Sequence, residues 1–257
     1  MSRANRVLAE ARAAWYSFIR RRTAVFFTFF FPVIIILIFG ALVQTQPTGG
    51  GLFTEPAGYY VPGYLAVVVL FTPLSRVGST VARHREGNRF EKLATTPLSR
   101  AEWLLAHTLV NVLIIGLASL IILALVVLVT GAEILFSPLL VPFVALGVAL
   151  FCGLGALLGR VADSQDGVIA ASNGVALPLL FLSETFVPLS LLPEWFHPLV
   201  NLSPLTWFSR GVRGATYWPL QDGGGAGTVD PIASLALLLV LTTGFFLAGA
   251  IALPQTD

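Results

Sequence analysis

Six apolar stretches of this 257-residue chain fit the length of a helix that crosses a membrane. Such a helix needs about 20 predominantly apolar residues to span roughly 30 Å of hydrocarbon. The composition agrees, because 11% of the residues are charged and 56% are hydrophobic, whereas soluble domains carry about 25% charged residues. The sequence therefore predicts an all-α integral membrane protein with six transmembrane helices and excludes a cytosolic enzyme. The stretches lie at about 24–43, 60–82, 103–129, 138–158, 168–183 and 232–253.

Lysine and arginine are concentrated in alternate segments between these stretches. Twelve of the fifteen lie before the first stretch, between the second and third, or at Arg160 between the fourth and fifth. Arg210 and Arg213 lie in the intervening segments, and Arg76 lies inside the second stretch. Because short loops that keep Lys and Arg remain in the cytoplasm, the pattern predicts that both termini are cytoplasmic.

The segments outside the stretches are too short for a separate soluble domain, since the longest, 184–231, has fewer than 50 residues. We therefore expect one transmembrane domain over 1–257 and no nucleotide-binding domain. A phosphate-binding loop places glycines before a lysine, and the only lysine, Lys92, does not follow such a loop. The three histidines are far apart, so no metal or catalytic site is expected, and the near-even charge balance predicts no nucleic-acid partner.

Arg76 is the one charged residue within a predicted span. A charge inside the bilayer is costly and is usually retained for function. Two interpretations stay open: the side chain extends to the headgroup layer, or it lines a polar pathway or helix pair. An ion-coupled transporter is expected to carry an acidic residue near mid-membrane, and the predicted spans have none. A further pattern, Gly155-x-x-x-Gly159, permits close helix packing without identifying the partner helix.

The N-terminal arm, residues 1–23, has a helical rhythm of apolar and basic residues. This pattern favours an amphipathic helix in the membrane surface, and the alternative is an ordinary basic flank before the first span. The apolar side comprises Val7, Leu8, Ala11, Ala14, Trp15, Phe18 and Ile19.

The predicted cytoplasmic loop between the second and third stretches contains a short helix signal. Phe90 and Leu93 are three residues apart, which places them on one helix face. Thr96-Pro97 is expected to end this helix, and Ser99 with Glu102 forms a capping box that starts the next one. The loop therefore predicts a short helix presented to a protein partner.

Four prolines interrupt the apolar segment 186–207, at Pro188, Pro193, Pro198 and Pro204. They exclude one continuous helix, yet the segment is too apolar for a solvated loop. A re-entrant or interfacial helical hairpin on the outer side satisfies both constraints. The tryptophans at 195, 207 and 218 then mark the headgroup zone.

These two segments, in this order around six spans, resemble the type 2 ABC-transporter permease family and its drug-exporting, daunorubicin-resistance-like branch. The resemblance covers nearly the whole chain. Two residues depart from the family pattern, Glu184 and Ser203. The matching cytoplasmic motif is Glu86, Gly87, Glu91, Leu93, Thr96, Pro97, Leu98 and Ser99. The matching outer motif is Pro188, Leu192, Pro193, Glu194, Trp195, Pro204, Leu205, Thr206 and Arg213.

The resemblance implies a permease that pairs with a second copy of itself and with two separate ATPase subunits, in the plasma membrane of a bacterium or archaeon. ATP and magnesium are then expected on the ATPase, with no cofactor on this chain. The segment Arg85 to Thr96 becomes a coupling helix, whose implied ATPase contacts are Glu86, Gly87, Arg89, Phe90, Glu91, Lys92, Leu93 and Pro97. The resemblance likewise implies that the outer motif forms a gate at the outer end of the transport pathway.

Two other function classes remain as hypotheses. One is a proton- or ion-coupled carrier that acts without an ATPase. The other is a membrane anchor or sensor subunit, which is disfavoured because so little of the chain lies outside the predicted spans. The expected function is export of an amphipathic drug, natural product or lipid-linked compound.

Overall fold

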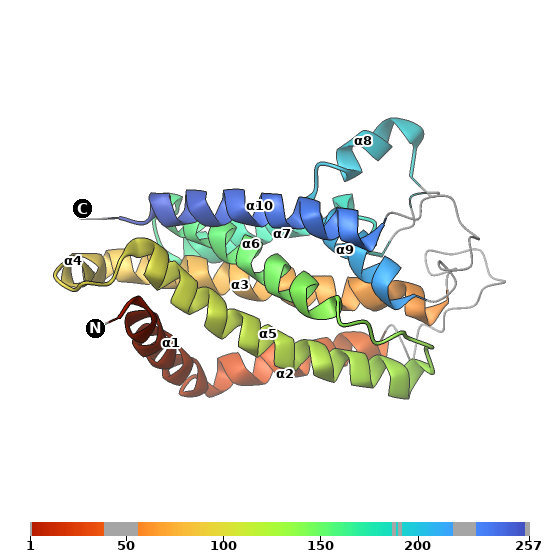
Figure 1. Ribbon diagram of the computed structural model, residues 1–257, viewed down its shortest axis with the longest axis horizontal. Helices are drawn as coiled ribbons and strands as arrows, with labels where there is room; N and C mark the ends of the chain where they lie inside the picture. The colour runs from red at the N-terminus through yellow and green to blue at the C-terminus, as the bar shows by residue number, and fades with distance from the viewer. Residues whose placement is uncertain (1, 39–55, 187–188, 190–191, 218–229, 255–257) are drawn as a thin grey trace.

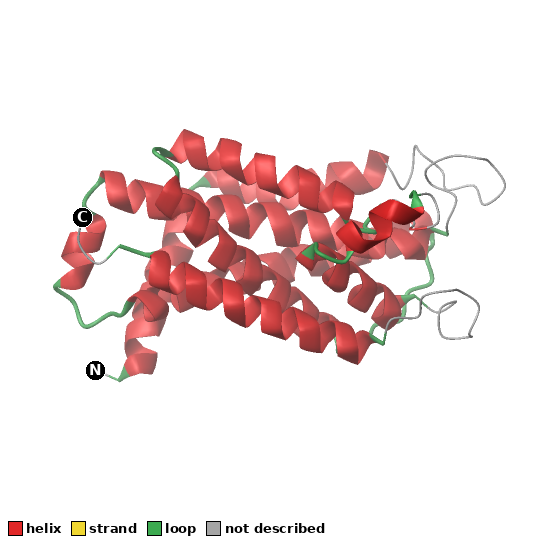
Figure 2. Cartoon of the chain, turned by 90° about the horizontal axis from the view of Figure 1, so that it is seen from above, coloured by secondary structure: helices red, strands yellow, loops and turns green. Residues whose placement is uncertain are grey.

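The computed structural model describes residues 2–38, 56–186, 189, 192–217 and 230–254. Every regular element in these ranges is a helix (Figure 2). The α-helices are α1 (Arg3–Ile19), α2 (Arg22–Ile36), α3 (Val61–Glu86), α4 (Arg89–Ala94), α5 (Arg100–Thr130), α6 (Leu140–Val161), α7 (Gln165–Leu182), α8 (His197–Val200), α9 (Pro204–Thr216) and α10 (Pro231–Ala252). Short 3-10 turns cover Ala57–Tyr60 and Glu194–Phe196.

Five of these helices are long and apolar enough to cross a membrane: α3 with its preceding turn, α5, α6, α7 and α10. Each falls on one of the predicted stretches, within a few residues at either end. The first predicted stretch, 24–43, coincides with α2, which is described for 15 residues. The part of this stretch beyond residue 38 lies outside the described residues, so the sixth crossing stays a prediction.

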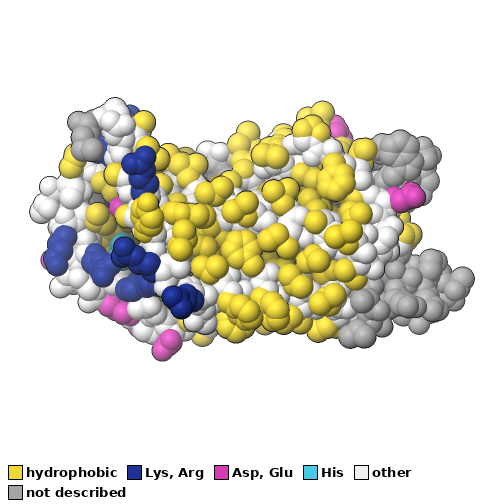
Figure 3. All heavy atoms as spheres, turned by 90° about the horizontal axis from the view of Figure 1, so that it is seen from below, with side chains coloured by type: hydrophobic (Ala, Val, Ile, Leu, Met, Phe, Trp, Pro, Cys, Tyr) yellow, Lys and Arg dark blue, Asp and Glu magenta, His cyan; other side chains and the backbone are white. Residues whose placement is uncertain are grey.

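The bundle has two chemically different ends (Figure 1). The start of α1, the whole of α4 and the end of α10 lie at one end, which we name the α4 end, and α8 and α9 lie toward the other. Lys and Arg side chains gather at the α4 end, beside an apolar lateral surface (Figure 3). Large apolar residues such as Leu120 and Leu128 on α5 are exposed, as expected for helices that face lipid.

Helix α3 forms the centre of the bundle and packs against α5, α6, α7 and α9, while α6 also packs against α10. Glycines bring the α3 and α6 backbones together. A Cβ atom on Gly155 would lie 2.5 Å from the Leu74 carbonyl oxygen, and one on Gly159 would lie 2.4 Å from that of Gly78. The Gly155-x-x-x-Gly159 pattern therefore serves packing within the chain.

The sequence correctly predicts how α5 begins. Ser99 Oγ accepts a hydrogen bond from the Glu102 backbone N–H at 3.2 Å, and Glu102 Oε2 accepts one from the Ser99 backbone N–H at 2.8 Å. This capping box satisfies two backbone donors at the helix start. Gly131, in a left-handed conformation with φ of 64°, ends the same helix.

The proline-rich segment is interrupted, as predicted. Its described part contains the turn Glu194–Phe196, α8 and α9, and Pro204 occupies the first turn of α9. Most of α9 is buried, including Leu205, Phe208 and Val212 at 0% exposure. Pro188 and Trp218 lie outside the described residues, and re-entry into a membrane stays a prediction.

Candidate functional site

The loop between α3 and α5 folds into the predicted short helix. Gly87 follows the last residue of α3, and Asn88 adopts a left-handed conformation with φ of 48°, which asparagine tolerates better than most residues. These two residues reverse the chain so that α4 begins at Arg89. On α4, Arg89, Glu91 and Lys92 are exposed, whereas Leu93 is half-buried and Phe90 is buried. Pro97 is exposed in the loop after it.

An aromatic cluster fixes α4 to the bundle. The Phe90 ring centroid lies 5.6 Å from that of Trp103 on α5 and 5.5 Å from that of His84 on α3. Trp103 is 2% exposed and also stacks near His107, with ring centroids 4.1 Å apart. Phe90 therefore points into the bundle, and a partner contact through its ring stays a prediction, as do the contacts of the exposed α4 residues.

The end of α3 is tied to the turn between α6 and α7. Arg85 Nη1 donates hydrogen bonds to the carbonyl oxygens of Gly159, Arg160 and Ala162, at 3.2, 2.8 and 2.9 Å. Glu86 Oε1 accepts a hydrogen bond from the Gln165 backbone N–H at 3.2 Å. Cationic and anionic side chains thus occupy the end of α6 and the start of α7, where each complements the helix dipole. Glu86, predicted as a partner contact, is exposed and already binds this turn.

Helix α1 is attached to the first turns of α5 by two polar pairs that the sequence did not predict. Arg6 Nη2 donates to Glu102 Oε1 at 2.6 Å, and Arg6 Nε donates to Oε2 at 3.3 Å. Glu10 Oε1 lies 3.3 Å from His107 Nε2. This contact with the His107 side chain holds the pKa of the Glu10 carboxyl below its ordinary value of 4.5.

The apolar face predicted for the N-terminal arm packs partly against the bundle. Ala14 and Phe18 are buried, and Ala11 and Trp15 are packed against the core, while Leu8 and Ile19 are about half exposed. The structure confirms that this arm forms a helix. The placement of the helix in a membrane surface stays a prediction. Elements α1, α3 and α4 all converge on the first turns of α5.

Arg76 lies on the half of α3 that faces α1. Its guanidinium Cζ is 4.3 Å from the centroid of the Phe18 ring, a cation–π contact between the two helices. The side chain is half-buried. Both interpretations of Arg76 remain open on these contacts alone.

At the opposite end of the bundle, Arg213 is 5% exposed and joins three segments. Its Nη2 donates to the Glu184 carbonyl oxygen at 2.6 Å, its Nε donates to the Tyr59 carbonyl oxygen at 3.3 Å, and its guanidinium stacks 3.9 Å above the Tyr59 ring. The Glu184 side chain forms two hydrogen bonds with Arg210, one of them 3.0 Å long from Nε. Sequence reasoning singled out Arg213 but missed its partners.

The other predicted gate residues lie on either side of α8. Thr206 is buried and its hydroxyl donates to the Val200 carbonyl oxygen at 2.6 Å. Trp195 is 72% exposed, and Pro193 is exposed beside it. The Leu192 carbonyl oxygen lies 3.1 Å from His197 Nε2. Pro204 and Leu205 are buried at the start of α9.

Comparisons with known proteins identify the family. The chain is 27% identical over 192 residues to the transport permease ycf38 of Porphyra purpurea, in a match that covers 71% of this chain and 64% of that protein. It is also 27% identical over 175 residues to nodulation protein J of Sinorhizobium fredii, covering 67% of this chain and 63% of that protein. The chain thus matches less than two thirds of either relative's length. A family model described as ABC-2 type transporter matches residues 6–217. The chain belongs to the ABC-2 type transporter family, as the resemblance of its two motifs predicts.

Proposed function

We propose that this chain is the permease subunit of an ATP-binding-cassette exporter that moves an amphipathic drug, natural product or lipid-linked compound out of a cell. Two separate ATPase subunits bind at the α4 end, and two copies of the permease form the pathway. Membership of a family of membrane transport permeases that normally work with an ATP-binding subunit supports this proposal. The drug-exporting branch is the finer assignment, and it comes from the sequence motifs.

The observation that carries the proposal is the way α4 is held. The helix presents Arg89, Glu91 and Lys92 to solvent, while Phe90 is buried between α3 and α5. A buried aromatic anchor transmits a displacement of α4 to both long helices, because close-packed interiors move as units. A short, charged and rigidly mounted helix is suited to receive force from a docked protein.

The charge distribution supports a cytoplasmic position for the α4 end. The Lys and Arg side chains gathered there (Figure 3) are typical of the cytoplasmic side of a membrane protein. The start of α1 and the end of α10 lie at the same end. With α2 as the first of six crossings, both termini are cytoplasmic, in the plasma membrane of a bacterium or archaeon. ATP and magnesium bind the partner, since Lys92 is outside any phosphate-binding loop.

The mechanism is a population shift between inward- and outward-facing states. Closure of the ATPase dimer on ATP favours one arrangement of α4, and the connected helices follow it. Arg85 extends the connection to the α6–α7 turn through its three carbonyl contacts. At the other end, Arg213 joins α9 to the segments of Tyr59 and Glu184, and we assign the gate to the point where these elements meet.

A reconstitution experiment tests the proposal. The permease is purified with an ABC ATPase from the same organism, placed in liposomes, and assayed for ATP hydrolysis with and without amphipathic compounds. We expect stimulation by a transported compound and its loss in Glu91→Lys. Glu133→Lys is the matched control, because Glu133 is also exposed but lies in the loop before α6, outside α4.

Two outcomes would contradict this function. Equal stimulation of ATP hydrolysis in Glu91→Lys and Glu133→Lys would contradict the role of α4 in coupling. Transport driven by a pH gradient in liposomes that contain this protein alone would instead establish an ion-coupled carrier. The mass of the solubilised permease, measured in the same preparation, tests whether the permease contains two copies of this chain.

A further inference from the structure

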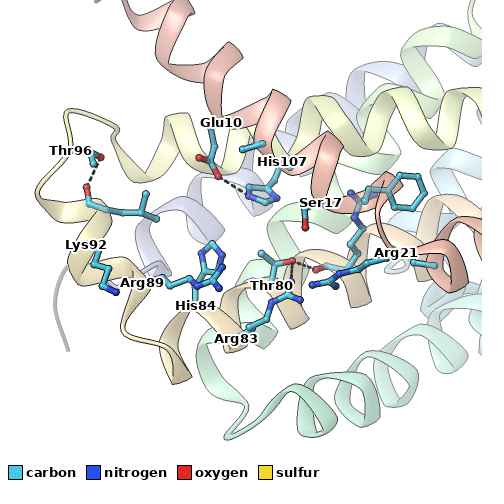
Figure 4. Close-up of a pocket in the computed structure, with 16 residues that line it drawn as sticks. Glu10, Ser17, Arg21, Thr80, Arg83, His84, Arg89, Lys92, Thr96 and His107 are labelled. Carbon is cyan, nitrogen blue, oxygen red and sulfur yellow. Dashed lines mark hydrogen bonds and ion pairs between the residues drawn. The ribbon is translucent and has the colours of Figure 1, made fainter.

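A basic pocket of about 690 Å³ opens between α1, α3 and α4 at the α4 end. Five cationic side chains line it: Arg21, Arg76, Arg83, Arg89 and Lys92 (Figure 4). Glu10 is the single carboxylate in its lining, and His107 lies 3.3 Å from that group. The pocket therefore carries a strong excess of positive charge.

The carboxylates of the described residues leave the cations of the basic pocket unpaired. Within the described part of the sequence, none of the five forms an ion pair with a carboxylate. Arg83 Nη2 donates to the Thr80 hydroxyl at 3.3 Å, a neutral acceptor. Like charges around one partly enclosed cavity repel each other and raise the local concentration of anions. An anion in the pocket would offset this repulsion.

Three buried nitrogen atoms in the lining also lack a hydrogen-bond partner among the described residues. They are Arg76 Nη1, His84 Nδ1 and His107 Nε2. Buried polar atoms in folded proteins are nearly always satisfied. The Arg76 guanidinium is held in place by Phe18, so it is preorganised to bind an oxyanion through its planar fork.

At the α4 end, where the pocket lies, basic side chains adjoin the apolar lateral surface (Figure 3). Helix α1, which forms one wall, carries the exposed apolar residues Leu8, Tyr16 and Ile19. This pattern is typical of a helix at the level of lipid headgroups. An anion at this level would come from the membrane more readily than from solution.

We propose that the basic pocket binds a phosphate-bearing anion, with the headgroup of an anionic phospholipid as its source, and that this ligand bridges α3 to α4. Arg76 and Arg83 bind the phosphate from α3, and Arg89 and Lys92 bind it from α4. Occupancy then favours arrangements in which α3 and α4 are close together. The site is independent of the identity of any transported compound, and it shares Arg89 and Lys92 with the α4 surface proposed to receive the ATPase.

Lipid retention tests the pocket without an ATPase. The protein is transferred from bilayer nanodiscs of equal phosphatidylglycerol and phosphatidylcholine into neutral detergent, and the retained lipid is counted by native mass spectrometry. We expect preferential retention of phosphatidylglycerol. In Arg76→Gln/Arg83→Gln, retention should fall by about tenfold or more, because a hydrogen bond to a charged group contributes roughly that factor.

Arg12→Gln/Arg20→Gln is the matched control, since both arginines lie on or directly after α1, are exposed, and are outside the pocket lining. It should retain the lipid as the wild type does. Arg89→Gln/Lys92→Gln provides a second test if the first variant does not fold, because both of these side chains are exposed. Equal losses in the control and pocket variants, or equal retention of the two lipids, would overturn the proposal.

Inorganic phosphate distinguishes the two sources of the anion. In lipid-free detergent, we measure the melting temperature with added phosphate for the wild type and for Arg76→Gln/Arg83→Gln. A rise that depends on these arginines, without retention of phosphatidylglycerol, would support the phosphate site and assign it to a soluble anion. If phosphatidylglycerol is retained and added phosphate does not displace it, the result supports the lipid as the source of the anion.

Discussion

The close approach of α6 to α3 gives the sharpest test of the fold. We consider Gly155→Ala/Gly159→Ala, which adds two methyl groups to this contact. The new Cβ atoms would lie 2.5 Å from the Leu74 carbonyl oxygen and 2.4 Å from that of Gly78, whereas ordinary contacts begin at 3.4 Å. The helices must therefore separate by about 1 Å, a gap that already removes up to half of the dispersion energy of the atoms concerned.

Overpacking of this kind costs about 1–3 kcal/mol per site. The two glycines share one interface, so their effects interact, and we expect the double variant to lose about 2–6 kcal/mol of unfolding free energy. The assay is reversible unfolding in mixed micelles by increasing mole fractions of dodecyl sulfate, followed by circular dichroism.

Gly116→Ala/Gly174→Ala is the matched control. Both glycines are in transmembrane helices, α5 and α7, and a Cβ at either would meet no atom within 4 Å. Alanine is the better helix former by about 0.5–1 kcal/mol, so this variant should be as stable as the wild type or slightly more so. Similar unfolding curves for the two double variants would refute the inferred α3–α6 contact.

Three further changes have definite expected results. Phe90→Ala should leave the basal ATPase rate of the reconstituted complex unchanged and abolish its stimulation, because α4 loses its aromatic contacts with His84 and Trp103. Glu184→Gln should lower the unfolding free energy by about 3–5 kcal/mol, because it leaves the half-buried guanidinium of Arg210 without its carboxylate. Glu10→Gln should lower thermal stability relative to the wild type at pH values above 4.5, because contact with the His107 side chain depresses the pKa of the Glu10 carboxyl. Since a depressed carboxyl pKa stabilises the fold only while the group is ionised, this difference should disappear as the pH falls below 4.5 through the lowered pKa.

Each of these changes has a control. Phe136→Ala alters an exposed phenylalanine at the opposite end of the bundle, and an equal loss of stimulation there would contradict the role of Phe90. Glu184→Gln/Arg210→Gln should recover part of the lost stability, and a larger loss in the double variant would argue against pairing. A stability difference for Glu10→Gln that persists unchanged well below pH 4.5 would contradict the assigned ionisation.

The parts of the fold that the sequence predicts are those set by local chemistry. Hydrocarbon requires every backbone group to be paired within its own segment, so apolar length predicts the position of each helix. The start of α5 follows from two residues three positions apart, Ser99 and Glu102. Hydropathy places the end of α3 near residue 82, but the helix continues to Glu86. Hydropathy marks only the apolar part of a helix, whereas a polar final turn forms the same backbone hydrogen bonds in water as in lipid.

Contacts between helices were not predictable from one sequence. The Arg6–Glu102 pair joins residues 96 positions apart, and Arg210 and Glu184 are separated by 26. No local pattern marks these partners. The same limit applies to Phe90: helical spacing placed it on a face with Leu93, but Trp103 and His84 decide that this face points partly inward.

The kinds of contact at the two sides of α3 indicate where the molecule moves. Toward α6, only glycine hydrogens lie between the backbones of the two helices. Sliding of α6 along α3 would therefore bring α6 atoms into collision with carbonyl oxygens of α3. Toward α1, the contacts are the cation–π contact of Arg76 with Phe18 and the basic pocket, which can rearrange by rotamer changes. Arg85 nevertheless ties the α6–α7 turn to the end of α3. A displacement of α4 should therefore carry α3, α6 and the start of α7 as one body, while α1 changes its distance from them.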